Sequence, residues 1–175
     1  DPGYSGAYAV LAVQIHGKEV WIIDEVYKQG WVVHDVIDEC GTRPWWENVS
    51  HGVIDIAGRQ HHGMESQIEV WLHYGKKRLY SQQVPVLAGI ERHRTFLRDP
   101  SSGQPLLFHD PRCVNTIKEY GLYVYPKSKE HSNVVEVPID QFNHSIKAIA
   151  YGLCANFGMV ERPPLGNVSI SFRKG

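Results

Sequence analysis

Residues 7–27, AYAVLAVQIHGKEVWIIDEVY, decide the class of fold. Two apolar runs of strand length lie on either side of His16-Gly17-Lys18, and this short polar segment has the composition of a tight turn. The segment therefore predicts a β-hairpin of two antiparallel strands.

Strand and helix patterns alternate after the hairpin. Helices are expected at residues 32–40, 64–75, 93–99, 113–121 and 139–158, and strands at residues 51–58, 84–90 and 121–126. The second of these helices has an apolar face made of Met64, Ile68, Trp71 and Leu72. This order of elements predicts an α/β fold, in which helices cover the faces of a mixed sheet.

The composition fits one ordinary globular domain. Of 175 residues, 42% are hydrophobic and 21% are charged, which is enough to build a single core. The net charge of -1 excludes a global basic field, so any nucleic-acid site would be a local patch. Three cysteines without a C-x-x-C pair argue against a zinc site or a disulfide framework and fit a reducing compartment.

Two acidic residues stand where a charge needs a partner. Asp55 lies within an apolar strand pattern, where a carboxylate is unfavourable unless it is paired, hydrogen-bonded or bound to a metal. Asp1 precedes the first strand in the turn-like sequence DPG. Each acid is also compatible with a simpler role, which is to cap a turn at an exposed strand end. On neighbouring strands, the two carboxylates would form a site for Mg²⁺ or Mn²⁺.

Residues 139–158 have two different faces when they are drawn as a helix. The apolar face contains Phe142, Ile146, Ile149 and Leu153. The opposite face, called the polar face below, contains Asp140, His144, Lys147 and Tyr151. A polar row of this kind is usually a solvated surface, but His144 and Asp140 lie one turn apart and can share a ligand. If this face meets the strand ends, an imidazole or a third carboxylate joins the two acids.

These segments make the chain similar to a known group of nucleases. Residues 1–10, DPGYSGAYAV, resemble the first motif of RuvC-like Holliday-junction resolvases and their relatives in the ribonuclease H-like superfamily. The whole of residues 1–157 resembles the nuclease domain of a tailed-bacteriophage large terminase. The stretches that carry this resemblance are VWIIDEVY, GVIDIAG, HDPRCVNTIKEYGLYVYP and DQFNHSIKAIAYGL. It implies a ribonuclease H-like sheet, with antiparallel hairpin strands followed by parallel strands. The proline and polar content of the last stretch, ERPPLGNVSISFRKG, indicates a C-terminal tail, at residues 158–175.

The resemblance also implies an activity and a set of site residues. The activity is metal-dependent hydrolysis of double-stranded DNA with little sequence specificity, by an endonuclease that cuts the concatemeric phage genome. Asp1 matches the first catalytic acid and Asp55 the second. At the third position, the usual pattern N-H-x-x-D-A has Lys147 in place of the aspartate. The expected catalytic residues and metal ligands are therefore Asp1, Asp55, His144 and Asp140.

Lys147 and two arginines are the residues expected to bind DNA. A lysine ammonium about 4 Å from a divalent cation opposes it by several kcal/mol. Lys147 is therefore expected to point outward toward a phosphate, or else it weakens one metal site. Arg59 and Arg112 are candidates for gripping the DNA backbone, although both are equally compatible with ordinary surface positions.

The implied cofactor is Mg²⁺ or Mn²⁺, as one or two ions. The implied partners are double-stranded DNA, an ATPase domain upstream in the same polypeptide, the portal and the small terminase subunit. The sequence contains no G-x-x-x-x-G-K-[ST], and it begins at the expected catalytic acid without the apolar residues of a first strand. We therefore expect a piece of a longer polypeptide. The expected location is the host cytoplasm, within the packaging complex, without secretion or membrane contact.

Two other functions stay open from the sequence. A Holliday-junction resolvase or transposase-type nuclease would use the same acids on a different DNA shape, and it would cleave a four-way junction faster than linear duplex. A catalytically impaired docking module of the packaging machine would carry Lys147 as the mark of a lost site. Mn²⁺ would not raise the melting temperature of such a module.

Overall fold

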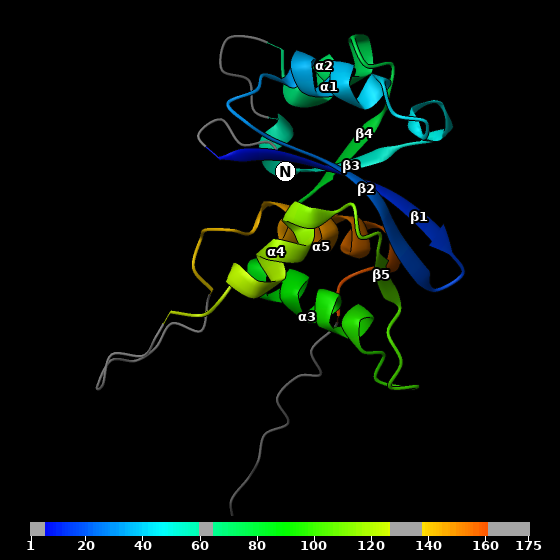
Figure 1. The fold of residues 1–175 in the computed structure, drawn as a ribbon, viewed down its shortest axis with the longest axis vertical. Helices are drawn as coiled ribbons and strands as arrows, with labels where there is room; N and C mark the ends of the chain where they lie inside the picture. The colour runs from blue at the N-terminus through cyan, green and yellow to red at the C-terminus, as the bar shows by residue number, and fades with distance from the viewer. Residues whose placement is uncertain (1–5, 60–64, 127–137, 161–175) are drawn as a thin grey trace, which may run out of the picture.

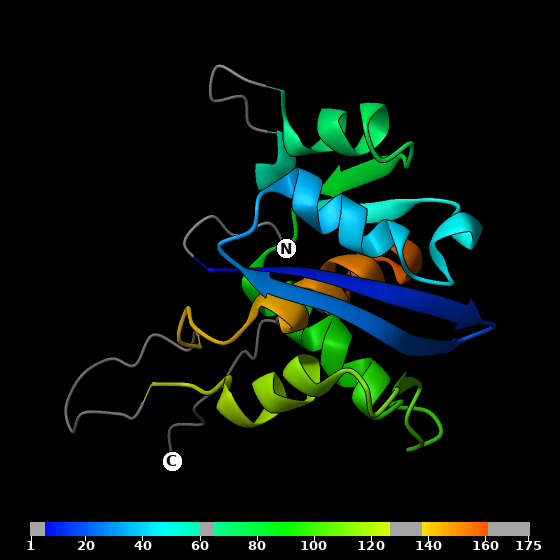
Figure 2. The ribbon, with the colours of Figure 1, turned by 45° about the horizontal axis from the view of Figure 1, so that its top comes forward.

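The computed structural model describes residues 6–59, 65–126 and 138–160 (Figure 1). The predicted hairpin is present as strands β1 (Ala7–His16) and β2 (Glu19–Gln29), which pair antiparallel along their whole length. Gly17 in the connecting turn has a φ of 63°, a conformation that glycine adopts without strain. The hairpin crosses the middle of the molecule in both views (Figures 1 and 2).

The other strands are short and pair in parallel. Strand β5 (Leu107–His109) joins β2, which gives a three-stranded piece of order β1-β2-β5. Strands β3 (Gly52–Asp55) and β4 (Leu79–Gln82) pair with each other. The predicted mixture of antiparallel and parallel strands is confirmed, but among the described residues these strands form two separate pieces of sheet.

Helices cover both sides of the strands (Figures 1 and 2). Helices α1 (Val33–Gly41) and α2 (Gln67–His73) lie on one side. On the other side lie α3 (Val86–Leu97), α4 (Val114–Leu122) and α5 (His144–Phe157). Two short 3₁₀ helices, η1 (Trp46–Asn48) and η2 (Ile56–Arg59), flank β3. Helix α5 is central, because it packs against β1, β3, α3 and α4.

Apolar side chains form two cores, one on each side of the hairpin. The first core joins the hairpin to α1 and α2 and contains Tyr8, Val26, Val36, Ile37, Cys40, Val70 and Trp71. The second joins it to α3, β5, the residue before α4, and α5, and contains Val20, Ile22, Phe96, Leu107, Cys113, Ile149 and Leu153. Ile149 and Leu153 lie one turn apart on α5, so the second core fixes the face of α5 that meets the sheet.

Two of the predicted strands are wrong. Residues 84–90 are not a strand, because from Val86 they form the first part of α3, and the helix expected at residues 93–99 is its continuation. Gly89 lets α3 approach α5 closely, since a Cβ there would lie 3.1 Å from that of Ala150. Residues 121–126 are the end of α4 followed by a segment that is not a strand, in which the Val124 carbonyl accepts the Ile139 N–H at 3.0 Å. Strands β4 and β5 were not predicted.

Two helix predictions need correction in detail. Helix α5 begins at His144, so Asp140 and Phe142 precede it, and Phe142 is exposed with a φ of 53°. In α2, Trp71 is buried, but Leu72 is 42% exposed and lies outside the core. Met64 lies outside the described residues.

The three cysteines, Cys40, Cys113 and Cys154, are buried free thiols. Burial raises the pKa of the Cys40 thiol to about 12 and that of Cys113 to about 11, so both stay protonated and unreactive at neutral pH. No helix among the described residues has both the length and the apolar character needed to cross a bilayer.

Candidate functional site

His144 lies where the first turn of α5 meets the start of β1. The Ala7 backbone N–H donates to the imidazole Nε2 at 3.4 Å. A Cβ added to Gly6 would lie 2.5 Å from the same ring, so the absence of a side chain at Gly6 allows this close approach. Burial lowers the pKa of His144, and the nearby charge of Glu119 partly opposes this effect. A neutral imidazole is the form that accepts hydrogen bonds and binds metals.

Asp55 is joined directly to the polar face of α5. It is the last residue of β3, and its Oδ2 accepts the Tyr151 hydroxyl at 2.7 Å. Tyr151 lies two turns after His144, on the same side of the helix. Burial, and then the hydrogen bond to Asp55, raises the pKa of Tyr151, so the phenol stays protonated and donates. Oδ1 accepts the Ala57 N–H at 3.2 Å, so Asp55 also caps the turn after β3.

Asp140 and Lys147 form an ion pair with each other. Lys147 Nζ lies 2.8 Å from Asp140 Oδ1, and Asn143 donates to the same oxygen at 3.0 Å. The hydrogen bond from Lys147 is the main reason why the pKa of Asp140 is lowered. The lysine is therefore directed at a carboxylate. An ammonium paired in this way opposes a nearby cation less than a free one does.

The sequence analysis missed Glu119, a carboxylate of α4 that is buried beneath α5. Its Oε1 accepts the His144 N–H at 3.1 Å and the Tyr27 hydroxyl at 2.8 Å. Its Oε2 accepts the N–H groups of Ser145 at 2.8 Å and Ile146 at 3.1 Å. The first N–H groups of a helix have no partner within the helix, and a negative charge is favourable there. Glu119 therefore fixes the end of α5 that carries His144.

Glu25 of β2 does the same for α4. Its two oxygens accept the backbone N–H groups of Asn115 and Thr116, together with their side-chain donors. No side chain of the N-cap residue caps α4 or α5. An acid within an apolar strand pattern, as at Glu25, was the signal that could have indicated such a cap.

Three of the predicted metal ligands, Asp55, Asp140 and His144, are described residues; Asp55 and Asp140 contact Tyr151 and Lys147 of α5, and His144 begins that helix. Within residues 6–59, 65–126 and 138–160, no group of three or more His, Cys, Asp or Glu side chains could hold a metal ion. Asp1, the remaining predicted ligand, lies outside the described residues.

The two predicted DNA-binding arginines lie in different places. Arg59 ends η2, the turn that directly follows Asp55, and its side chain is exposed. Arg112 lies between β5 and α4, and its Nε donates to Asp110 at 2.9 Å. Arg59 is therefore close to Asp55 in the sequence. The side chain of Arg112 instead binds Asp110 in its own loop.

The arrangement of strands and helices is similar to that in solved structures of phage large terminases. The nuclease domain of g2p, the large terminase of bacteriophage SPP1, with bound Mn, has a TM-score of 0.64 and 15% identity, over 87% of this chain and 80% of that one. The large terminase of a thermophilic bacteriophage has a TM-score of 0.67 and 16% identity, over 88% of this chain and 38% of that one. The complex of that thermophilic-phage terminase with ATP-γ-S has a TM-score of 0.69.

These comparisons confirm the predicted mixed α/β fold and the resemblance to terminase nuclease domains. At 15–16% identity, the likeness establishes the fold. The chain spans about 38% of the length of the thermophilic-phage large terminase. Neither the protein-family models nor the curated protein sequences gave a match.

Proposed function

We propose that this chain is a divalent-metal-dependent endonuclease that cleaves double-stranded DNA during genome packaging by a tailed phage. The nuclease domain is residues 1–157, and residues 158–175 are a tail. The main support is the joining of Asp55, at the end of β3, to the face of α5 that begins with His144. The similar fold of a Mn-bound terminase nuclease domain supports the choice of cofactor.

The chemistry of the donors fits Mg²⁺ or Mn²⁺. Asp55 offers carboxylate oxygen and His144 offers imidazole nitrogen, and Mn²⁺ accepts both. We propose Asp1 as the third ligand and Asp140 as an additional one, with one or two ions bound. A bound ion supplies Lewis acidity, which lowers the pKa of a water molecule and offsets the charge of the phosphodiester.

The protein's own residues hold and orient these groups. The Tyr151 hydroxyl fixes the orientation of the Asp55 carboxylate, and Glu119 fixes the backbone of His144. Lys147 becomes available to a DNA phosphate when Asp140 turns to a cation, and Arg59 and Arg112 extend the contact with the DNA backbone. Contacts with phosphates carry no base information, so cleavage depends little on sequence.

The biological context extends the proposal. The thermophilic-phage large terminase, which is similar over 38% of its length, was also solved with ATP-γ-S. We propose an ATPase domain upstream of this chain in the same polypeptide. The further partners are the portal and the small terminase subunit, and the place of action is the host cytoplasm.

Plasmid digestion tests the proposed function. The wild-type chain is expected to nick or linearise plasmid DNA with Mn²⁺ and more weakly with Mg²⁺. Asp55→Asn is expected to reduce the rate by about 100-fold or more, because it removes a charged metal ligand. The matched control is Asp38→Asn on α1, which also removes a carboxylate that accepts a tyrosine hydroxyl, from Tyr74 at 2.8 Å.

The Asp38→Asn control is expected to retain the wild-type rate. Equal cleavage by wild type and Asp55→Asn would contradict the proposal, because the activity would then come from a contaminant or another site. Faster cleavage of a four-way junction than of linear duplex would instead favour a resolvase.

A further inference from the structure

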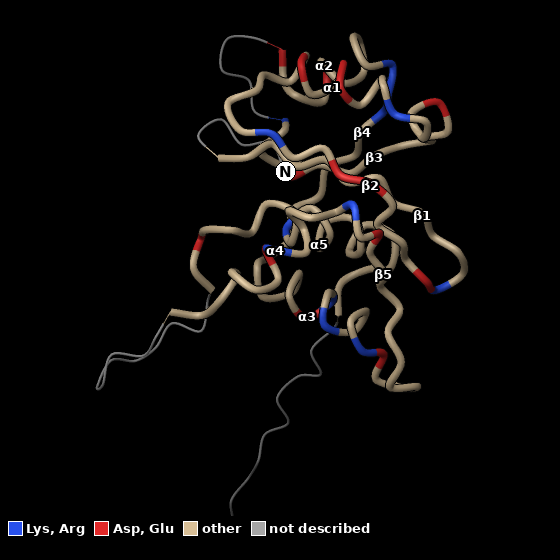
Figure 3. Tube along the Cα trace, viewed as in Figure 1, with Lys and Arg blue, Asp and Glu red and all other residues tan. Residues whose placement is uncertain are grey.

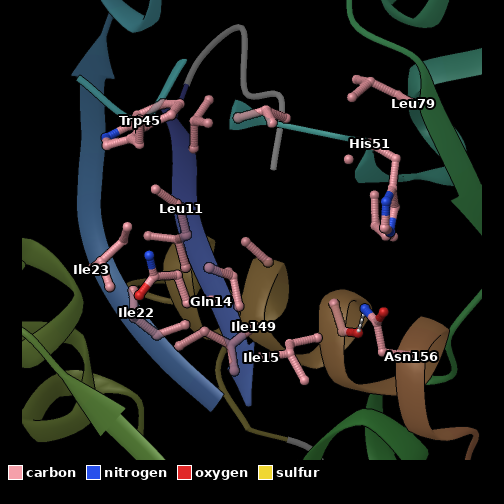
Figure 4. A pocket seen from close by; sticks show the side chains of 18 of the residues that line it. Leu11, Gln14, Ile15, Ile22, Ile23, Trp45, His51, Leu79, Ile149 and Asn156 are labelled. Carbon is pink, nitrogen blue, oxygen red and sulfur yellow. Dashed lines mark hydrogen bonds between the residues drawn. The ribbon is translucent and has the colours of Figure 1, made fainter. Parts of the chain in front are cut away.

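The polar face of α5 carries a positive charge between two of the side chains that are proposed to bind metal. Lys147 follows His144 by one turn of the helix and precedes Tyr151 by another, and the Tyr151 hydroxyl binds Asp55. The opposite face of α5 is fixed, because Ile149 packs in the second core and lines an apolar groove of about 320 Å³ beside β1 (Figure 4). The backbone of Lys147 is therefore held between His144 and the contact with Asp55.

The ammonium of Lys147 is paired with a carboxylate that is almost fully exposed to solvent. Lys147 Nζ lies 2.8 Å from Asp140 Oδ1, and the side chains are 29% and 87% exposed, respectively. Asn143 donates to the same Asp140 oxygen at 3.0 Å, so both of these contacts use Oδ1. An ion pair with so exposed a partner is weak, and either charge can exchange it for a stronger partner.

Both charges of this pair act on the candidate site. Burial lowers the pKa of His144, and among the smaller effects Lys147 lowers this pKa further while Asp140 raises it. Burial also raises the pKa of Tyr151, and the charge of Asp140 adds to that increase. Asp140 is therefore within electrostatic reach of His144 and of the hydroxyl that binds Asp55. While the pair stays together, the two charges oppose each other, and Asp140 attracts a cation only weakly.

We propose that the Asp140–Lys147 ion pair is a latch that couples metal binding to DNA binding at the candidate site. A DNA phosphate takes the Lys147 ammonium and leaves Asp140 free for a divalent cation. In the same way, a cation that takes Asp140 leaves Lys147 free for a phosphate. When both ligands bind, the pair is separated once instead of once for each, so each ligand tightens the binding of the other. This inference rests on the proposed function, in which the site binds both.

The coupling is reciprocal, so it is measured from both sides. Calorimetry gives the affinity for Mn²⁺ with and without a short DNA duplex, and fluorescence anisotropy gives the affinity for the duplex with and without Mn²⁺. The titrations are run in the cold, and a gel checks that the duplex stays intact. We expect each ligand to tighten the other by the same factor, about tenfold or more.

Removal of either charge opens the latch. Lys147→Met keeps a long side chain without the charge, and Asp140→Asn keeps the shape of the carboxylate. Without DNA, Lys147→Met is expected to bind Mn²⁺ about tenfold more tightly than the wild type, because Asp140 is then free and no ammonium opposes the ion. In both variants we expect only the coupling that comes from direct attraction between ion and phosphate, and the double variant is expected to lose no more.

The duplex titrations separate a latch from an ordinary phosphate-binding lysine. Lys147→Met is expected to weaken duplex binding about tenfold more strongly with Mn²⁺ than without it, because Lys147 stays with Asp140 when the ion is absent. An ordinary phosphate contact would be lost equally under both conditions, and that result would overturn the proposal.

The matched control is an exposed ion pair on α3, in which Arg94 lies 3.1 Å from Glu91. Arg94→Met and Glu91→Gln are expected to keep the wild-type coupling. Equal coupling in the wild type and in Lys147→Met would overturn the proposal. Weaker binding of Mn²⁺ by Lys147→Met in the absence of DNA would overturn it as well.

Cleavage of plasmid DNA is measured separately from binding. Coupled binding without cleavage would refute the proposed function and leave the latch intact. Cleavage that requires Asp55, together with uncoupled binding, would overturn the latch alone. A chain that binds no Mn²⁺ would refute both.

Discussion

Glu119 brings a negative charge into the interior, and hydrogen bonds compensate it. Its donors are the Tyr27 hydroxyl and three backbone N–H groups at the start of α5. A buried carboxylate without such donors costs several kcal/mol. Glu25 is equally well satisfied beneath α4, but its donors come from Asn115 and Thr116. The two glutamates therefore cap their helices in similar ways, but of the two, Glu119 is the one that contacts a residue of the candidate site, His144.

Glu119→Gln is expected to weaken Mn²⁺ binding by about tenfold or more, because the amide nitrogen of glutamine cannot accept the N–H groups that position His144. Glu25→Gln is the matched control. Both variants are expected to lose about 1–3 kcal/mol in the free energy of unfolding, but Glu25→Gln is expected to keep the wild-type affinity for Mn²⁺. Urea unfolding and calorimetric Mn²⁺ titration of both variants make the comparison. If Glu119→Gln and Glu25→Gln bind Mn²⁺ with the same affinity, Glu119 stabilises the fold but does not position a metal ligand.

Helices α3 and α4 and strand β5 meet at a buried histidine. His93 of α3 is 4% exposed, and its Nε2 lies 2.6 Å from the Tyr120 hydroxyl of α4. His109 of β5 lies within 3.2 Å of the same hydroxyl. Burial, with a smaller contribution from His109, lowers the pKa of His93 to about 4. Helix α3 and strand β5 share the second core with α5, so a proton on His93 disturbs the layer that supports the candidate site.

Acid is therefore expected to destabilise the fold. The unfolded chain binds a proton at His93 near pH 6.5, and the folded chain binds one only near pH 4. The unfolded state thus binds more protons in this interval, and stability is lost as the pH falls through it. The expected loss between pH 7 and pH 5 is about 2 kcal/mol in the free energy of unfolding.

Urea unfolding at the two pH values measures this loss. His93→Phe is expected to show a smaller difference between pH 7 and pH 5 than the wild type. His16→Phe, at the exposed end of the hairpin, is expected to keep the wild-type difference. If His93→Phe loses as much stability between pH 7 and pH 5 as the wild type, His93 is not the group that makes the fold sensitive to acid.

The molecule as a whole is two layers of helices around strands, with α5 linking the two pieces of sheet. Acidic and basic segments occur in both layers (Figure 3), in keeping with the net charge of -1. The chain therefore has no general positive field that could attract DNA. In the proposed function, DNA would therefore be bound through local contacts near α5 and through the ion.

The sequence predicts the long elements well and the short ones poorly. The hairpin, α1, α4 and α5 were predicted because their apolar residues follow a clear period over nine residues or more. Strands β4 and β5 have only four and three residues, which is too few for a period. Residues 84–90 were read as a strand because a short apolar run fits a buried strand and a helix equally well.

The same limit applies to the candidate site. Asp55 and the polar face of α5 were predicted, because a charge in an apolar strand and a helical row of polar residues are local patterns. The hydrogen bond that joins them, between Asp55 and Tyr151, spans 96 residues. The role of Glu119 depends on a helix that begins 25 residues later. The convergence of Asp1 with these residues stays a prediction.

A Mn²⁺-soaked crystal gives the most direct test of the central claim, that Asp55 and the first turn of α5 hold divalent metal. We expect one or two anomalous peaks between the end of β3 and His144, with distances of about 2.0–2.5 Å to an Asp55 oxygen and to the His144 imidazole. A protein that cleaves DNA with Mn²⁺ but shows its peaks elsewhere, or none beside α5, would contradict it.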